Sequence, residues 1–106
     1  MTDILDRLET LIAERLQQGA AESSYVARQA ARGRLKLAEK VGEEAVETVI
    51  AAIAQDDEAL IGEAADLIFH LLILLGERGI SLDQVRAELE RREGQSGLDE
   101  KAGRRK

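Results

Sequence analysis

The stretch "ALIGEAADLIFHLLILLG", residues 59–76, decides the fold of this chain. Its only polar side chains are those of Glu63, Asp66 and His70, which at about 100° per residue fall within roughly 60° of one helical face. A helix that is apolar around nearly its whole circumference is normally buried. The stretch therefore predicts a core helix that carries a narrow acidic strip inside the protein.

Apolar residues recur at helical spacing on both sides of this stretch, and no segment has the pattern of a strand. Helix start and stop signals bound five segments. We expect helices over residues 3–18, 24–32, 35–55 and 57–77, and a fifth that starts after Ser81 and ends near Glu93. The sequence therefore predicts an all-α fold, an antiparallel helical bundle of about five helices.

Particular residues mark the ends of these helices. Gly33 is expected to stop the second helix, and Arg78 with Gly79 has the pattern of a last turn followed by a left-handed glycine. Ser81 and Gln84 have the spacing of a capping box for the fifth helix. These signals predict short connections, which place consecutive helices side by side and antiparallel.

Composition points to one small helical domain. The chain has 106 residues, of which 44% are hydrophobic and only 2% aromatic, and it has no proline. Its core must therefore consist of Leu, Ile, Val and Ala, which suits packed helices. The ending "GQSGLDEKAGRRK" is Gly-rich and polar and lacks periodicity. We expect a folded domain over 1–93 and a disordered polar tail over 94–106.

Charge and residue usage exclude several classes of protein. The net charge of −6 argues against a nucleic-acid partner, which needs a basic face. The absence of cysteine excludes disulfides, thiolate catalysis and Cys-based zinc sites. The acidic start "MTDILDRLETLI" lacks the basic region of a secretory signal, and the apolar run "LIFHLLILLG" is too short to span a bilayer. We expect a cytoplasmic protein with no membrane partner.

The stretch "KLAEKVGEEAVETVIAA", residues 36–52, is a second helix with unfavourable features. Gly42 lies in mid-helix, where glycine costs about 1 kcal/mol relative to alanine. The like-charged Glu43, Glu44 and Glu47 follow it directly. On a helical wheel Glu44 lies closest to the apolar arc, Glu47 at its margin and Glu43 in a more exposed direction. That arc holds Leu37, Val41, Ala45, Val49, Ala52 and Ile53.

Two acidic pairs of the same form predict a metal site. Glu44-x-x-Glu47 and Glu63-x-x-Asp66 each place two carboxylates one turn apart on one helical face. If the two helices are antiparallel neighbours, the pairs face each other, and carboxylates about 5.5 Å apart repel by roughly 3 kcal/mol at an effective dielectric near 20. A cation between them removes this cost. All-oxygen ligation favours Mg²⁺, or Mn²⁺, over zinc.

Other interpretations of the same residues stay open. Most such acidic pairs are solvated helix surface, but the apolar surroundings of residues 59–76 favour a metal site here. His70 is more often a hydrogen-bonded core residue or a support behind the ligands than a ligand itself. Lys36 and Lys40 have the spacing either to pair with the glutamates or to hold phosphate. Gly42 can admit a substrate or a neighbouring helix close to the backbone.

The acidic pattern also resembles a known superfamily. Glu-x-x-Glu, 15 residues and Glu-x-x-Asp are similar to the signature of the all-α NTP pyrophosphohydrolases (the MazG-like superfamily), which bind Mg²⁺ through the four acids and cleave between the α and β phosphates. Within it, "SY" at Ser24–Tyr25, Gly33, Lys36, "KVGEEAVE" and "EAADLIFHLLILL" resemble the phosphoribosyl-ATP pyrophosphohydrolase family over about residues 4–92. Val26 and Phe69 depart from its pattern, where Thr and Tyr are expected.

The resemblance implies a reaction and a set of site residues. The reaction is Mg²⁺-dependent hydrolysis of phosphoribosyl-ATP to phosphoribosyl-AMP and pyrophosphate, the second step of L-histidine biosynthesis, by a homodimer that completes the helical bundle. The implied metal ligands are Glu44, Glu47, Glu63 and Asp66. The implied catalytic group is Glu43, Glu44 and Glu47, with Glu43 orienting water or standing behind the ligands. The implied contacts to the nucleotide substrate are Lys36, Lys40, Arg28, Arg32 and Tyr25.

Two other functions remain compatible with the sequence. The first is a housecleaning NTP pyrophosphatase on the same scaffold, which differs in substrate choice. The second is a non-enzymatic dimeric helical module whose acids serve only to pair helices. That module predicts no change in thermal stability on adding Mg²⁺, whereas a real site raises the melting temperature by mass action.

Overall fold

The computed structural model describes residues 2–94, and within that range the chain is all-helical with no strand. This confirms the predicted fold class, and the helix ends lie within one residue of those expected. The predicted tail over 94–106 lies, apart from Gly94, outside the described residues. The five helices are α1 (Ile4–Gln18), α2 (Tyr25–Ala31), α3 (Arg34–Ala54), α4 (Asp57–Glu77) and α5 (Leu82–Arg92).

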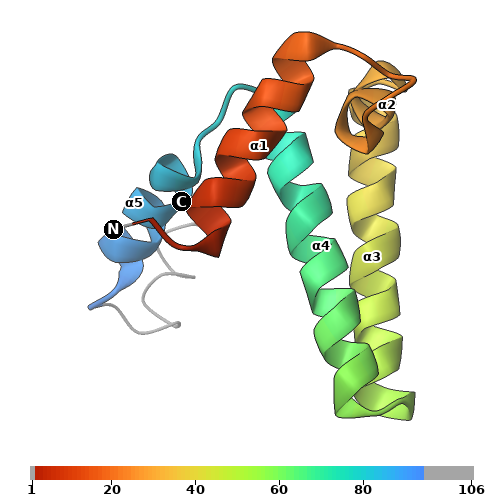
Figure 1. Ribbon diagram of the computed structural model, residues 1–106. Helices are drawn as coiled ribbons and strands as arrows, with labels where there is room; N and C mark the ends of the chain where they lie inside the picture. The colour runs from red at the N-terminus through yellow and green to blue at the C-terminus, as the bar shows by residue number, and fades with distance from the viewer. Residues whose placement is uncertain (1, 95–106) are drawn as a thin grey trace.

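Helices α3 and α4 form a long antiparallel hairpin, which dominates the structure (Figure 1). At the turn between them, Asp56 accepts a hydrogen bond from the backbone N–H of Ala59 at 2.9 Å and so caps α4. At the opposite end, the Arg34 guanidinium donates to both carboxylate oxygens of Glu77, at 2.7 and 3.1 Å. The Arg34–Glu77 ion pair therefore joins the two helices at the end opposite the turn.

The connection between α4 and α5 has the predicted cap geometry. Gly79 has φ 74°, and its N–H donates to the carbonyl of Gly76 while the N–H of Ile80 donates to that of Leu75. This is a Schellman motif, in which the left-handed residue favours glycine. The following capping box is also confirmed, since Ser81 and Gln84 each accept a hydrogen bond from the other's backbone N–H.

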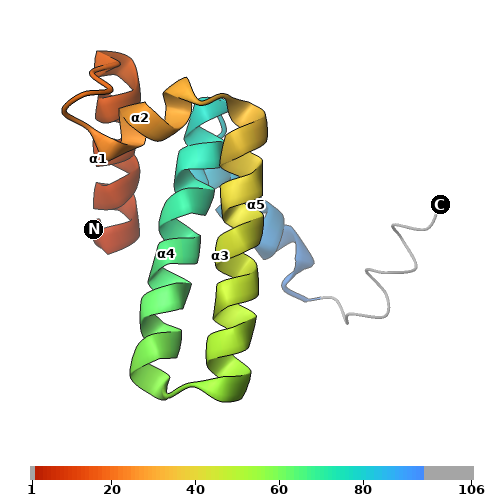
Figure 2. The same cartoon turned by 90° about the vertical axis from the view of Figure 1, so that its right-hand side faces the viewer.

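The buried core lies at one end of the hairpin, where α1 packs on the C-terminal half of α4 and α2 lies against the start of α3 (Figure 2). A Cβ added to Gly76 would lie 3.0 Å from Leu16 Cδ1, so this glycine allows α1 and α4 to approach closely. The core residues come from four helices: Ile12, Val26, Leu37, Leu72 and Ile73.

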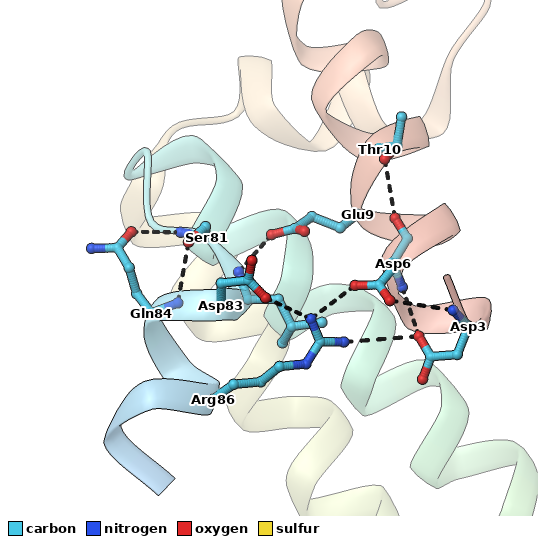
Figure 3. A network of polar contacts seen from close by, with 9 residues as sticks. Asp3, Asp6, Glu9, Thr10, Ser81, Asp83, Gln84 and Arg86 are labelled. Carbon is cyan, nitrogen blue, oxygen red and sulfur yellow. Dashed lines mark hydrogen bonds and ion pairs between the residues drawn. The ribbon is translucent and has the colours of Figure 1, made fainter. Parts of the chain in front are cut away.

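Helix α5 is attached to α1 by polar contacts, and none of its residues is buried (Figure 3). Arg86 donates to Asp6 and Asp83, both at 2.8 Å, and Glu9 accepts from the backbone N–H of Leu82. The hydrogen bond from Arg86 holds the pKa of Asp6 below its usual value. Polar contacts to α1 and the partly buried Leu82, which packs against the core, therefore hold α5 in place.

The prediction that α4 is buried around its circumference is wrong for the described chain. Ile61, Ile68 and Leu71 of α4 are exposed, on the side away from its acidic strip. The reason is that α1 and α2 cover only one end of the hairpin, and no other described helix covers the rest.

Helix α3 has a similar uncovered face. Leu37 is buried as expected, but Val49 and Ile53 of the predicted apolar arc are 56% and 81% exposed, and Ala51 is buried instead. The exposed residues recur at helical spacing and point away from α4. They are Val46, Val49, Ile50 and Ile53, and we call them the outer apolar face.

By length and composition, α4 is the one helix among residues 2–94 that could cross a membrane. Glu63, Asp66 and His70 lie in its middle, where a lipid environment would penalise polar groups heavily. The helix also packs along α3 over its length. We therefore interpret α4 as the central helix of a helical domain.

Candidate metal centre between α3 and α4

Three of the four predicted ligands meet between the long helices. Glu44 from α3 and Glu63 and Asp66 from α4 each offer a carboxylate oxygen, and these oxygens lie within 4.8 Å of one another. Glu44 is 4% exposed, Glu63 is partly buried and Asp66 is exposed. The cluster thus runs from the interior of the hairpin to its surface, as a site that admits solvent and a substrate must.

Two oxygens of this cluster lack a hydrogen-bond partner. They are Glu44 Oε2 and Glu63 Oε2, which are buried and unpaired within the described chain. A buried polar atom without a partner costs about 1–3 kcal/mol, and more when it is charged. An all-oxygen cluster with two unsatisfied carboxylate oxygens fits a hard divalent cation such as Mg²⁺ or Mn²⁺.

Glu47 and Glu43 lie at the edge of this arrangement. Glu47 is exposed and is not part of the three-residue group. At about 100° per residue it points roughly 60° away from Glu44, toward the side of α3 that does not face α4. The side chain of Glu43 is 63% exposed and lies 3.8 Å from Lys40. Glu44 is the deepest of the three acids, as predicted, and Glu43 and Glu47 are both exposed.

Lys40 pairs directly with the buried acid. Its Nζ lies 3.3 Å from Glu44 Oε1, and this contact raises the pKa of the Lys40 ammonium. Lys36, one turn earlier, lies 3.1 Å from Glu39 and makes no hydrogen bond or ion pair to the acidic cluster. Of the two interpretations open for these lysines, pairing with glutamates is the arrangement seen in the chain.

His70 is buried and supports the cluster from behind, in agreement with its predicted structural role. Its Nδ1 lies 2.7 Å from the backbone carbonyl of Asp66, which can only accept, so this nitrogen carries hydrogen. In the neutral ring, Nε2 then accepts from the hydroxyl of Tyr25, 2.8 Å away. These two hydrogen bonds connect Tyr25 of α2, through His70, to the turn of α4 that carries Asp66. No sequence signal indicates this contact, because the partners are 45 residues apart.

The three predicted substrate contacts in and directly after α2 do not contact the acidic cluster. They are Tyr25, Arg28 and Arg32. Tyr25 uses its hydroxyl on His70, and its ring stacks on Phe69 with centroids 6.1 Å apart. Arg28 donates to the carbonyl of Ala21, and Arg32 lies 3.4 Å from an acceptor within α2. Neither arginine makes an ion pair with the acidic cluster among residues 2–94.

The chain was compared with known proteins. The family model described as phosphoribosyl-ATP pyrophosphohydrolase matches residues 5–93. A phosphoribosyl-ATP pyrophosphatase of Sphingopyxis alaskensis is 62% identical over 104 residues, which is 98% of this chain and 95% of the relative. The protein of the same name from Erythrobacter litoralis is 67% identical over 100 residues, covering 94% of this chain and 95% of the relative. A third, from Zymomonas mobilis, is 56% identical over 104 residues, with 98% and 96% coverage.

Proposed function

The chain belongs to the phosphoribosyl-ATP pyrophosphohydrolase family, and from that premise we propose that its reaction takes place at the acidic cluster between α3 and α4. The chain is a hydrolase of histidine biosynthesis that converts phosphoribosyl-ATP to phosphoribosyl-AMP and pyrophosphate. These products leave one phosphate on the adenosine side, so the bond that breaks is the anhydride between the α and β phosphates. The three carboxylates within 4.8 Å of one another are the observation that carries the assignment of the site.

The proposed ligands of a divalent cation are Glu44, Glu63 and Asp66, with Glu47 as the fourth. The two unpaired buried oxygens of Glu44 and Glu63 support this assignment. A bound Mg²⁺ or Mn²⁺ supplies charge neutralisation for phosphate oxygens and a lower pKa for a bound water. Glu47 is exposed, so its side chain is free to turn toward the cluster. Glu43, also exposed, is placed to orient a water at the solvent side.

We propose that cationic residues on the same side of α3 receive the phosphates of the substrate. Lys40 lies against the acidic cluster, and Lys36 follows one turn away on the exposed surface. Tyr25 and Arg28 belong to α2, which lies beside the start of α3, and Arg32 directly follows α2. They are therefore proposed to contact the substrate at a greater distance from the bond that breaks.

The decisive experiment follows pyrophosphate release from phosphoribosyl-ATP with and without Mg²⁺. Release should depend on the metal, and common nucleoside triphosphates should react far more slowly. Adding Mg²⁺ without substrate should also raise the melting temperature, because the ion binds only the folded chain. Equal turnover of common triphosphates would favour a housecleaning pyrophosphatase, and release unaffected by chelation would reject the proposed site.

We also propose that two copies of the chain form a homodimer through the outer apolar face. Four large apolar side chains that are exposed on one side of a single helix favour an interface with another molecule. Gly42 lies within about 40° of the direction of Val46, Val49 and Ile53 on α3. Among residues 2–94 no packing neighbour lies within 4 Å of a Cβ placed there, so packing within that part of the chain does not require this glycine. A second copy that packs closely on α3 accounts for it.

Gly42→Ala should therefore weaken the dimer about tenfold, the effect of a lost close contact worth roughly 1.4 kcal/mol. The control is Gly62→Ala in mid-α4, where an added Cβ also meets nothing within 4 Å but which lies off the outer apolar face. It should only stabilise the fold, by about 1 kcal/mol. Sedimentation equilibrium gives the dimer constants. A Gly42→Ala variant that is stabilised like the control and dimerises normally would contradict this role for Gly42.

The relatives are named as a phosphoribosyl-ATP pyrophosphatase, an enzyme of histidine biosynthesis, which implies a soluble protein. We propose that this chain acts in the cytoplasm, where its nucleotide substrate would be made and consumed.

A further inference from the structure

The two carboxylate oxygens of Glu44 have different surroundings. Oε1 lies 3.3 Å from the ammonium of Lys40, whereas Oε2 is buried and has no hydrogen-bond partner in the described chain. The Glu44 side chain is only 6% exposed, and that of Lys40 is 30% exposed. One end of this ion pair is thus fixed in the interior, and the other reaches solvent on a flexible side chain.

We propose that Lys40 is a built-in counter-cation for Glu44. Its ammonium pairs with the Glu44 carboxylate when no metal is bound, and it moves toward the substrate phosphates when metal binds. This inference rests on the proposed metal site. It assigns to Lys40 a role that differs from that of a permanent support for Glu44. It also differs from that of a lysine that only contacts phosphate.

The physical reason is that two cations beside one buried carboxylate repel each other, even when each contacts a different oxygen. An ammonium beside Glu44 offsets the cost of burying its charge, which would otherwise be several kcal/mol. The same ammonium repels a divalent ion that approaches the cluster, because both are positive. Loading the metal must therefore loosen the Lys40–Glu44 contact. The released ammonium then lies next to the cluster, where phosphate oxygens would arrive.

Removing Lys40 has opposite effects under the two roles. If Lys40 supports Glu44 in its binding geometry, its loss leaves Glu44 misplaced and metal affinity falls. If Lys40 competes with the metal for Glu44, its loss raises metal affinity while the metal-free protein becomes less stable. The sign of the change in metal affinity therefore distinguishes the competitor from the support.

The experiment titrates the full chain with Mn²⁺ alone, without nucleotide, by electron paramagnetic resonance. Lys40→Met should bind Mn²⁺ about tenfold more tightly than the unmodified chain, the size expected for one positive charge near a divalent ion in a largely aqueous dielectric. The matched control is Lys36→Met. It removes the same charge from a lysine that lies one turn before Lys40 and pairs with Glu39 instead of Glu44. Its Mn²⁺ affinity should stay within about twofold of the unmodified chain.

A second set of measurements keeps the test independent of folding defects. In chelator, Lys40→Met should melt at a lower temperature than the unmodified chain, and saturating Mn²⁺ should raise its melting temperature by more than that of the unmodified chain. Lys40→Arg keeps the charge and should not bind Mn²⁺ more tightly. If Lys40→Met folds only with metal present, Lys40→Gln, which keeps a hydrogen-bond donor, replaces it in the titration.

Unchanged or weaker Mn²⁺ binding by the uncharged Lys40 variants would overturn the proposal. So would equal tightening by Lys40→Met and Lys36→Met, because that would be a general effect of charge. Failure of the unmodified chain to bind Mn²⁺ at all would instead reject the metal site itself, so the two failures are distinguishable.

Discussion

Replacing Glu63 by glutamine should lower kcat/KM for phosphoribosyl-ATP by about 10³-fold, equivalent to roughly 4 kcal/mol of transition-state stabilisation. The amide keeps the shape of the side chain but removes the charge that the proposed metal needs. The same change should stabilise the metal-free protein, because Glu63 Oε2 is a buried carboxylate oxygen with no partner in the described chain. A gain of about 1 kcal/mol would raise the melting temperature by about 4–8 °C in a domain of this size.

Activity and melting curves in chelator and in Mg²⁺ test this prediction together. Glu63→Gln should lose most of the Mg²⁺-dependent rise in melting temperature along with its turnover. The matched control is Glu58→Gln, an exposed acid in the first turn of the same helix, which should keep both. A Glu63→Gln protein that is less stable in chelator, or that retains turnover, would show that Glu63 does not serve as an unsatisfied metal ligand.

The double substitution Val49→Glu and Ile53→Glu should convert the proposed dimer to monomers. Both residues lie on the outer apolar face and are 56% and 81% exposed in the single chain, so the charges do not enter its core. Each apolar side chain buried at an interface contributes about 1.5–3 kcal/mol, and a dimer loses two copies of each. The dissociation constant should therefore rise by at least about 10³-fold.

Sedimentation velocity across a range of protein concentrations measures this effect. Leu89→Glu places the same charge on a residue of α5 that is 60% exposed and lies outside the outer apolar face, and it should leave the dimer intact. If the unmodified chain is monomeric at micromolar concentration, or if the double variant sediments like the unmodified chain, the outer apolar face is not the dimer interface.

The helices and the deepest acid were predictable because their signals are local in the sequence. Periodicity places Glu44 beside the residues that pack on α4, and the structure buries it there. The capping box at Ser81 is equally local, since its partners are three residues apart. The contact between Tyr25 and His70 had no such signal, because it depends on how α2 lies against α4.

The wrong burial predictions on α3 and α4 have one physical cause. Periodicity identifies an apolar side of a helix but does not say which molecule covers it. For Val49, Ile53 and Ile61 the sequence indicates burial, and the single chain leaves them exposed. Glu47 is a different case, since its spacing matches the signature while its direction on α3 leaves it outside the cluster. Its proposed ligation requires a side-chain movement that spacing cannot describe.

The attachment of α5 through charged groups makes it a separate cooperative unit of the structure. Because none of its residues is fully buried and only Leu82 packs partly buried on the core, α5 is expected to open to solvent hydrogen exchange at a lower free energy than the hairpin. Raising the ionic strength should favour this opening, because screening weakens exposed ion pairs. Acid should act likewise: Arg86 lowers the folded pKa of Asp6, so the stabilisation is present above the unfolded pKa and is lost as pH falls through the folded value. We therefore expect α5 to detach and return while the acidic cluster stays assembled.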